Sequence, residues 1–336
     1  MKKIILTASL LISALSPVIA AEVNVYSARK EELIKPLLDE FEKAQNVKVN
    51  LITGKADALI SRVASEGQFS PADVLLTTDV GRLQRAKEMS LLVATDSRVL
   101  EERIAANFRD EEGFWFALTK RARPIMYHPE RVNPDELGSI LDLTDSKWKG
   151  RICIRSSNNI YNQSMIASMI AKFGEQRVQQ WANDFVKNFA RKPKGGDRDQ
   201  IKAVVAGQCD IAIANTYYLA GMLADTDSEN QKIAEQLKVF WPDQQGSGAH
   251  INISGAAMLK HAPNKANALR LMEFLASESS QKWYADNNHE YPVVQGITMS
   301  ALLAGFGEFK AEDVQLQQVG ELNAAAIKLM DRAGWQ

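Results

Sequence analysis

The stretch Glu22–Ala44, EVNVYSARKEELIKPLLDEFEKA, joins an alternating apolar segment to a segment of helical periodicity. Its first six residues, EVNVYS, predict a strand. The remainder predicts a helix with a kink possible at Pro36. The apolar face of that helix is formed by Leu33, Ile34, Leu37, Leu38 and Phe41. A strand followed directly by an amphipathic helix indicates an α/β fold.

The same order repeats downstream. Val47–Thr53 predicts a second strand, DALISRVASEG predicts a second helix, and Ala72–Thr78 predicts a third strand. Strands that alternate with helices imply right-handed crossovers and a parallel sheet covered on both faces. Ligands of such sheets bind beyond the carboxyl ends of the strands. Tyr26 and Arg29 lie where the first strand ends.

Upstream, residues 1–21 have the pattern of a secretory signal peptide. The basic start MKK precedes the apolar IILTASLLISAL and the small residues of SPVIAA, so cleavage is expected after Ala20 or Ala21. The first cysteine is Cys153, so no lipid can be attached at the new N-terminus. No later segment is long and apolar enough to span a bilayer. We therefore expect a soluble protein exported to the periplasm.

Downstream, the chain predicts a second lobe. Phe114–Val132 is long and extended, with two prolines, and predicts a crossing between lobes. A second set of strands and helices follows it, and INISGAAMLK predicts a strand that returns to the first lobe. About 315 mature residues exceed one comfortable core. We expect an N-terminal lobe of residues 22–120 plus 245–293 and a C-terminal lobe of residues 121–244 plus 294–336, able to close like a hinge.

Composition and motifs exclude several classes of protein. Loss of Lys2 and Lys3 leaves 38 basic against 41 acidic residues, a net charge of about −3 that gives no basic footprint for nucleic acid. No nucleophile elbow, P-loop, HExxH or dinucleotide-binding pattern is present, so a secreted hydrolase remains only as a rival without a named nucleophile. The two cysteines, Cys153 and Cys209, predict a disulfide in an oxidising compartment, with two free buried thiols as the alternative.

Three tyrosines follow predicted strands of the second lobe. Tyr217 and Tyr218 follow CDIAIAN, and Tyr161 lies between the RICIRS strand and an apolar helix. Three phenolates would supply three negative charges and hard oxygens, which suits Fe³⁺ better than Ca²⁺, Mg²⁺ or Zn²⁺. Such a metal would be left half open, and a bidentate anion such as carbonate could complete its shell. That anion needs guanidinium partners, and the candidates are Arg29, Arg121 and Arg123.

The chain resembles the periplasmic ferric-ion-binding proteins of ABC iron importers over essentially the whole mature sequence. The resemblance is carried by VNVYSAR, GKADALISRV, SPADVLLTTD, LTKRARPI, RICIRSSNNIYN, ARKPKGGDRDQIKAV, GQCDIAIANTYY, NISGAAMLKHAPNKANA and NHEYPV. It implies a two-lobed, type II-like periplasmic binding fold with mixed, mostly parallel sheets.

The resemblance also implies roles for single residues. It makes Tyr161, Tyr217 and Tyr218 iron ligands, and it places Arg29 with Arg121 or Arg123 at a carbonate or bicarbonate. Asn215 matches a position that contacts this anion. Several relatives carry histidine, or histidine and tyrosine, after the YSxR position, whereas this chain has Lys30. We therefore expect the tyrosine-only, carbonate-assisted subtype, with Tyr26 packing the strand end.

These observations lead to one functional hypothesis and one rival. We expect a non-enzymatic protein, monomeric, that captures Fe³⁺ and delivers it to an inner-membrane ABC permease. The rival is the same fold binding an organic or inorganic anion without metal.

Overall fold

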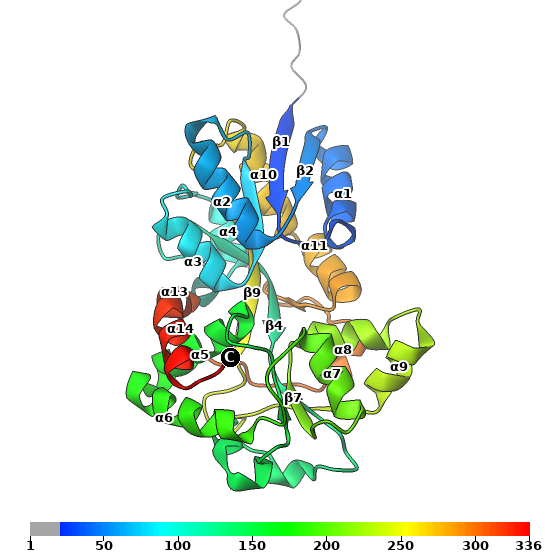
Figure 1. Ribbon diagram of the computed structural model, residues 1–336. Helices are drawn as coiled ribbons and strands as arrows, with labels where there is room; N and C mark the ends of the chain where they lie inside the picture. Colours follow the sequence, from blue (N-terminus) through cyan, green and yellow to red (C-terminus); the bar gives the residue numbers. More distant parts are fainter. Residues whose placement is uncertain (1–20) are drawn as a thin grey trace, which may run out of the picture.

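The computed structural model describes residues 21–336, so the predicted signal peptide, apart from Ala21, lies outside the described residues. The chain forms two lobes, each built around one sheet with helices against it (Figure 1). This arrangement confirms the two-lobed α/β class expected from the sequence. Within residues 21–336, none of the helices has the length and apolar character needed to cross a membrane.

The first lobe contains a six-stranded sheet and most of the N-terminal helices. Its strands are β1 (Glu22–Ser27), β2 (Lys48–Thr53), β3 (Val74–Thr78), β4 (Phe116–Ala122), β9 (Ile251–Met258) and β10 (Tyr291–Pro292). Its helices are α1 (Lys35–Gln45), α2 (Ala56–Glu66), α3 (Val80–Glu88), α4 (Arg98–Arg103), α10 (Lys265–Leu275) and α11 (Glu278–Trp283).

The second lobe contains a four-stranded sheet. Its strands are β5 (Ile125–Tyr127), β6 (Ile152–Cys153), β7 (Ile211–Ile213) and β8 (Lys238–Phe240). Its helices are α5 (Ile160–Phe173), α6 (Glu175–Phe185), α7 (Asp197–Val205), α8 (Thr216–Leu223), α9 (Ser228–Glu235) and α12 (Ala301–Ala304). The chain ends with α13 (Leu316–Glu321) and α14 (Asn323–Arg332).

The first helix begins differently from the sequence expectation. Glu31–Leu33 forms a separate 3₁₀ turn, and α1 starts at Lys35 with Pro36 in its first turn. Proline is tolerated there because the first helical N–H groups have no intrahelical acceptor. The helix is therefore interrupted before Pro36 instead of being kinked at it. Leu37, Leu38 and Phe41 are buried as expected.

Both sheets are mixed, but their pairing is less parallel than expected. The six-stranded order is β10-β4-β9-β3-β1-β2, and the four-stranded order is β6-β7-β5-β8. Among the strands of residues 21–336, β1–β2, β1–β3 and β6–β7 pair in parallel, and the other five pairings are antiparallel. The reason is the return path: β9 comes back from the second lobe and runs antiparallel between β3 and β4. The expected predominance of parallel strands was thus wrong.

Three segments connect the lobes: β4 to β5, β8 to β9, and β10 to α12. The chain leaves the first sheet through β4, enters the second sheet as β5 after Arg123 and Pro124, and returns as β9 (Figure 1). The expected boundary between residues 120 and 121 falls inside β4, because Arg121 is still in register with Asn252 of the first sheet. The division of the chain into exact lobe boundaries stays a prediction.

Cys153 and Cys209 form a disulfide, with their Cα atoms 5.9 Å apart. This confirms the predicted bridge and excludes the alternative of two free thiols. Cys153 ends β6, and Cys209 lies just before β7. The bridge therefore fastens together two neighbouring parallel strands of the second sheet.

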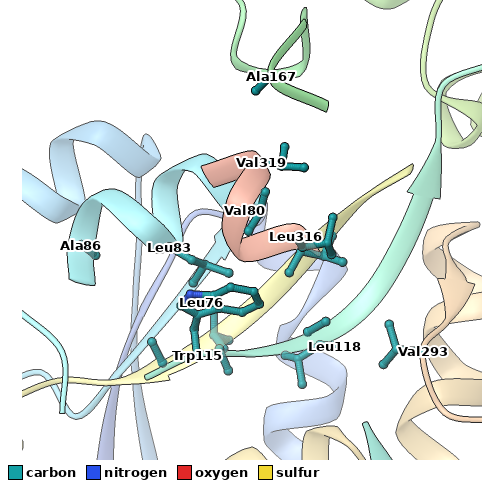
Figure 2. Packing of buried hydrophobic residues seen from close by; sticks show 14 of the residues in the cluster. Leu76, Val80, Leu83, Ala86, Trp115, Leu118, Ala167, Val293, Leu316 and Val319 are labelled. Atoms are coloured by element: carbon teal, nitrogen blue, oxygen red, sulfur yellow. The ribbon is translucent and has the colours of Figure 1, made fainter. Parts of the chain in front are cut away.

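The C-terminal helix α13 packs between the lobes, against α3 on one side and α5 on the other. Figure 2 shows Val319 of α13 between Val80 of α3 and Ala167 of α5, with Leu316 beside them. One buried apolar cluster consequently runs from the first sheet into the helices of the second lobe. The two lobes share a core in addition to their crossing strands.

Candidate functional site

A cleft of about 590 Å³ lies between the lobes. It receives residues from the ends of β1, β3 and β4, from the first turns of α5, α7 and α8, and from the segment before β10. Its lining consists of Ala28, Arg29, Lys30, Glu32, Leu33, Thr78, Arg121, Tyr161, Arg198, Tyr217, Tyr218, Gly221, Asn287, Asn288, His289 and Glu290. Strand ends and helix starts therefore converge on one cleft, as expected for ligand sites in α/β folds.

One wall of the cleft, here called the tyrosine wall, consists of Tyr161, Tyr217 and Tyr218. Tyr161 lies in the first turn of α5, and the adjacent pair lies in the first turn of α8 directly after β7. The hydroxyl of Tyr217 donates to the hydroxyl of Tyr161 at 3.2 Å, and the rings of Tyr217 and Tyr218 are 4.2 Å apart between centroids. The structure thus brings the three sequence-predicted phenols together.

The phenols of this wall resist ionisation. Burial is the main cause that raises the pKa of Tyr217 well above its usual value of 10, and the neighbouring Tyr161 and Tyr218 add to it. Burial also raises the pKa of Tyr218, again with Tyr161 as the next cause. Arg121 acts in the opposite direction on Tyr217 but does not outweigh burial. At neutral pH these two side chains are therefore neutral phenols, and only a strong cation could displace their protons.

The opposite wall, here called the arginine wall, consists of Arg29, Arg121 and Glu290, and Thr119 supports it from outside the cleft lining. Arg29 Nη2 donates to Glu290 Oε2 at 2.6 Å and to Thr119 Oγ1 at 3.1 Å. Thr119 Oγ1 itself donates to the same Glu290 oxygen at 2.6 Å. Arg121 Nη2 lies 3.8 Å from Glu290 Oε1 and donates to Ser254 Oγ. These groups are almost fully buried, so their charges are little screened by solvent.

The electrostatics of the arginine wall favour the charged forms of Glu290 and Arg121. Burial alone would raise the pKa of Glu290, but the guanidinium charges of Arg29 and Arg121 outweigh it and hold this pKa below its usual range. Arg121 also faces the other wall, with its guanidinium carbon 5.8 Å from the ring centre of Tyr161 and 5.6 Å from that of Tyr217. The guanidinium of Arg121 therefore lies near charged or aromatic groups of both walls.

Arg123 does not line the cleft. Its Nη1 donates to Asp197 Oδ1 at 2.8 Å and to Asn215 Oδ1 at 3.1 Å, and its Nη2 donates to Asn162 Oδ1 at 2.7 Å. Strand β4 ends at Ala122, so the alternation that predicted a common direction for Arg121 and Arg123 does not extend to Arg123. Asn215, bonded to Arg123, also lies outside the cleft lining. Direct contact of Arg123 or Asn215 with an anion stays a prediction.

Tyr26 lies outside the cleft as well. It is buried in the first sheet, and its hydroxyl donates to Glu66 Oε1 at 2.9 Å. Tyr26 therefore occupies the packing position expected from the sequence.

Lys30 lies at the lip of the cleft and is exposed, with its Nζ 3.5 Å from Glu32 Oε1.

Three cleft residues escaped sequence reasoning: Glu290, Arg198 and His289. Glu290 and His289 belong to the NHEYPV stretch, which carried the family resemblance but suggested no role. Among residues 21–336, no three histidine, cysteine, aspartate or glutamate side chains gather in a way that could hold a metal ion.

The chain is similar to known solute-binding and iron-binding proteins. Residues 69–304 match the family described as "Bacterial extracellular solute-binding protein". The chain is 46% identical to iron uptake protein A1 of Synechocystis over 94% of this chain and 88% of that protein. Among solved structures, it is similar to Trichodesmium IdiA/FutA in complex with iron and citrate, with a TM-score of 0.92 and 48% identity over 94% of this chain and 100% of the other. Apo ferric ion-binding protein A of Pasteurella haemolytica gives a TM-score of 0.87 and 45% identity over 94% and 98% of the two chains.

Proposed function

The chain belongs to the bacterial extracellular solute-binding proteins, and from this premise we propose that it captures Fe³⁺ in the periplasm and delivers it to an inner-membrane ABC importer. The observation that carries the proposal is the tyrosine wall, where three phenol oxygens gather in one cleft. The names of its relatives, an iron uptake protein and a ferric ion-binding protein, support the same cargo. The family works in solute transport, and we propose no catalytic role.

Tyr161, Tyr217 and Tyr218 would bind the metal as phenolates. Their oxygens are hard donors, and three negative charges balance the three positive charges of Fe³⁺. The low polarity that raises the pKa of Tyr217 and Tyr218 also strengthens the attraction between a bound cation and the ionised oxygens. Weaker divalent cations gain less from this attraction and would displace the phenol protons less readily.

A carbonate or bicarbonate would occupy the remaining coordination positions, held by Arg29 and Arg121. Both guanidiniums line the same cleft as the phenols. A planar guanidinium can donate two parallel hydrogen bonds to two oxygens of an oxyanion. Arg123 and Asn215 would support this site from behind the tyrosine wall, because their bonds fix Asn162 and Asp197 beside Tyr161 and Tyr217. Lys30 stands at the lip of the cleft and offers no ligand.

Closure of the lobes would complete the site. The tyrosine wall belongs to the second lobe and the arginine wall to the first, so a smaller opening would remove water between them and strengthen both sets of contacts. We expect the protein to act as a monomer and the closed form to dock on the permease.

The test is addition of ferric nitrilotriacetate to metal-free mature protein. Iron bound by phenolates should give a visible charge-transfer band that saturates at one iron per chain. A colourless protein that still binds carbonate or another oxyanion by calorimetry would contradict the ferric function and support the metal-free anion carrier. The matched control is Tyr26→Phe, which removes a buried hydroxyl outside the cleft and should leave the band unchanged.

A further inference from the structure

We propose that Glu290 is an internal counter-anion of the cleft that positions Arg29 and Arg121 and limits the charge of the anion that they accept. The inference rests on the proposed function, since it concerns the anion that accompanies the iron. It assigns this carboxylate a specificity role, in favour of a small, weakly charged oxyanion over polyanions such as citrate.

The position of Glu290 is fixed from three sides. Arg29 Nη2 and Thr119 Oγ1 both donate to its Oε2 at 2.6 Å, and Arg121 Nη2 lies 3.8 Å from its Oε1. The side chain of Glu290 is only 6% exposed, and the residue still lines the cleft. A carboxylate held in this way has little freedom to leave, so it remains beside the two guanidiniums when an external anion arrives.

The two arginines keep N–H groups for an external anion. Within residues 21–336, neither Nη1 nor Nε of Arg29 donates a hydrogen bond to the protein, and the same holds for Nη1 and Nε of Arg121. Arg121 Nε is buried and out of reach of an external anion, so the donors left for one are Nη1 of Arg121 and Nη1 and Nε of Arg29. Arg29 is held further by the ring of Tyr284, 5.2 Å from its guanidinium carbon. Both guanidiniums are therefore oriented but incompletely bonded.

Charge gives the site its selectivity. Arg29 and Arg121 carry two positive charges, and the buried carboxylate of Glu290 removes one of them. Three other charged residues line the cleft: Lys30, Glu32 and Arg198. Lys30 and Glu32 pair with each other, and all three are exposed, so solvent screens their charges. The arginine wall thus presents one net positive charge to an anion, and each additional negative charge on that anion would face Glu290 at close range.

Two replacements of Glu290, one neutral and one charged, distinguish a counter-anion from an ion pair that only supports the fold. The two roles predict different changes in anion binding. Glu290→Gln keeps an oxygen that can accept from Arg29 and Thr119 but removes the negative charge. Glu290→Asp keeps the charge but shortens the side chain. If Glu290 only supported the fold, both variants would weaken binding of every anion to a similar extent.

The experiment measures binding of bicarbonate, inorganic phosphate and citrate to the mature wild-type chain and to both variants. Each anion is titrated by calorimetry into metal-free protein and, separately, by the charge-transfer band with ferric iron present. We expect Glu290→Gln to shift the preference toward citrate over bicarbonate by about tenfold or more, as expected for one lost charge a few ångströms from the site. We expect Glu290→Asp to retain the wild-type preference. Thermal melting of both variants checks that they fold.

An unchanged preference in a folded Glu290→Gln variant would overturn the inference, as would equal weakening of all three anions. Because phosphate and citrate binding is measured without metal, this result does not depend on iron. A wild-type protein that binds anions but develops no ferric band would instead contradict the proposed function, while the anion preference of the variants would still test Glu290.

Discussion

The two walls of the cleft differ in the charge of their side chains before a ligand binds. The tyrosine wall is neutral, with a single hydrogen bond from Tyr217 to Tyr161 among its hydroxyls, and burial keeps Tyr217 and Tyr218 protonated. The arginine wall is charged throughout, and Glu290 already holds Arg29 through a 2.6 Å ion pair. Under the proposed function, the tyrosine wall would lose protons when the metal binds, whereas the arginine wall would only share its existing charges. Protonation should therefore weaken metal binding more than it weakens anion binding in the absence of metal.

Acidification should separate the walls most strongly. Tyr217 and Tyr218 have pKa values raised above 10, so both hold protons at all pH values below neutrality and must release them to bind iron. Each of the three proposed phenolate ligands releases one proton, so the apparent affinity should fall by about 1,000-fold for each pH unit lowered. Competition with a chelator of known protonation, between pH 7 and pH 5, measures this slope. Glu290 has its pKa held below the usual range and should stay charged there, so the charge of the arginine wall should change little over the same range. A flat iron affinity would contradict phenolate ligation.

Removal of the phenols is the next largest test. Tyr217→Phe combined with Tyr218→Phe deletes two proposed ligands and keeps their rings in place. Loss of a supporting partner alone weakens metal sites by about 10–100-fold, so loss of two direct ligands should reduce iron affinity by more than about 1,000-fold and abolish the visible band. Phosphate binding at the arginine wall should persist within about threefold. If the double variant retains full iron affinity, the metal lies elsewhere.

Opening the disulfide tests how the tyrosine wall is supported. Cys153 and Cys209 are separated by 56 positions and fasten β6 to β7, which precede the helices that carry Tyr161 and Tyr217. Replacement of both cysteines by serine should lower the free energy of unfolding by about 4 kcal/mol, if the chain-entropy account of disulfides holds. Urea unfolding of the oxidised wild type, the reduced wild type and the variant measures it. Equal stability of all three would show that the bridge contributes nothing.

Arg121 and Arg123 allow a matched comparison, since they are two positions apart but face different surroundings. Arg121→Gln should weaken iron and anion binding by about 10–100-fold with a smaller effect on folding. Arg123→Ala should instead destabilise the fold by about 3 kcal/mol, because it leaves Asp197 with only Arg155 as a cation. Binding isotherms and urea midpoints of the two variants, measured together, decide it. The reverse pattern would place Arg123 at the anion after all.

The smallest effect is expected at the lip. Lys30 is 77% exposed, and its 3.5 Å ion pair with Glu32 is of the surface type that contributes at most about 1 kcal/mol. Lys30→Ala should therefore change iron affinity by less than about threefold at physiological salt. A larger loss, measured by the same chelator competition, would show that the lip of the first lobe takes part in binding.

The tyrosine wall could be predicted from the sequence because its information is local. Each phenol follows a strand and opens a helix, and that pattern places it at a sheet edge wherever the rest of the chain goes. Glu290 could not be predicted in this way. It reaches Arg29 across 261 positions of sequence, and nothing around it marks it as more than a polar residue before a short strand. The prediction that Arg123 faces the same side as Arg121 was wrong for a related reason. Strand β4 ends at Ala122 because Ala122 pairs with Ile251, the first residue of the distant strand β9.

The sheet topology shows the same limit. The first three strands were predicted as a parallel set, and β1 does pair in parallel with both β2 and β3. The antiparallel insertion of β9 between β3 and β4 joins segments far apart in the chain, so no local periodicity could reveal it. The two lobes were predictable because length and the extended crossing segment require them, whereas their joint core through α13 was not.

The position of α13 has a consequence for proteolysis of the folded protein. A polypeptide cut before Leu316 would keep both sheets and every lining residue of the cleft, yet it would lose the wedge between α3 and α5. Helix α13 packs closely on α3, because a Cβ at Gly320 would lie 2.5 Å from Gln84 Cβ. Beyond α14, the indole of Trp335 donates to Arg155 O of the second lobe at 3.0 Å. The packing of α13 against both α3 and α5 thus ties the two lobes together at a place outside the cleft. Proteolysis before Leu316 should therefore loosen the contact between the lobes and leave every lining residue of the cleft in place.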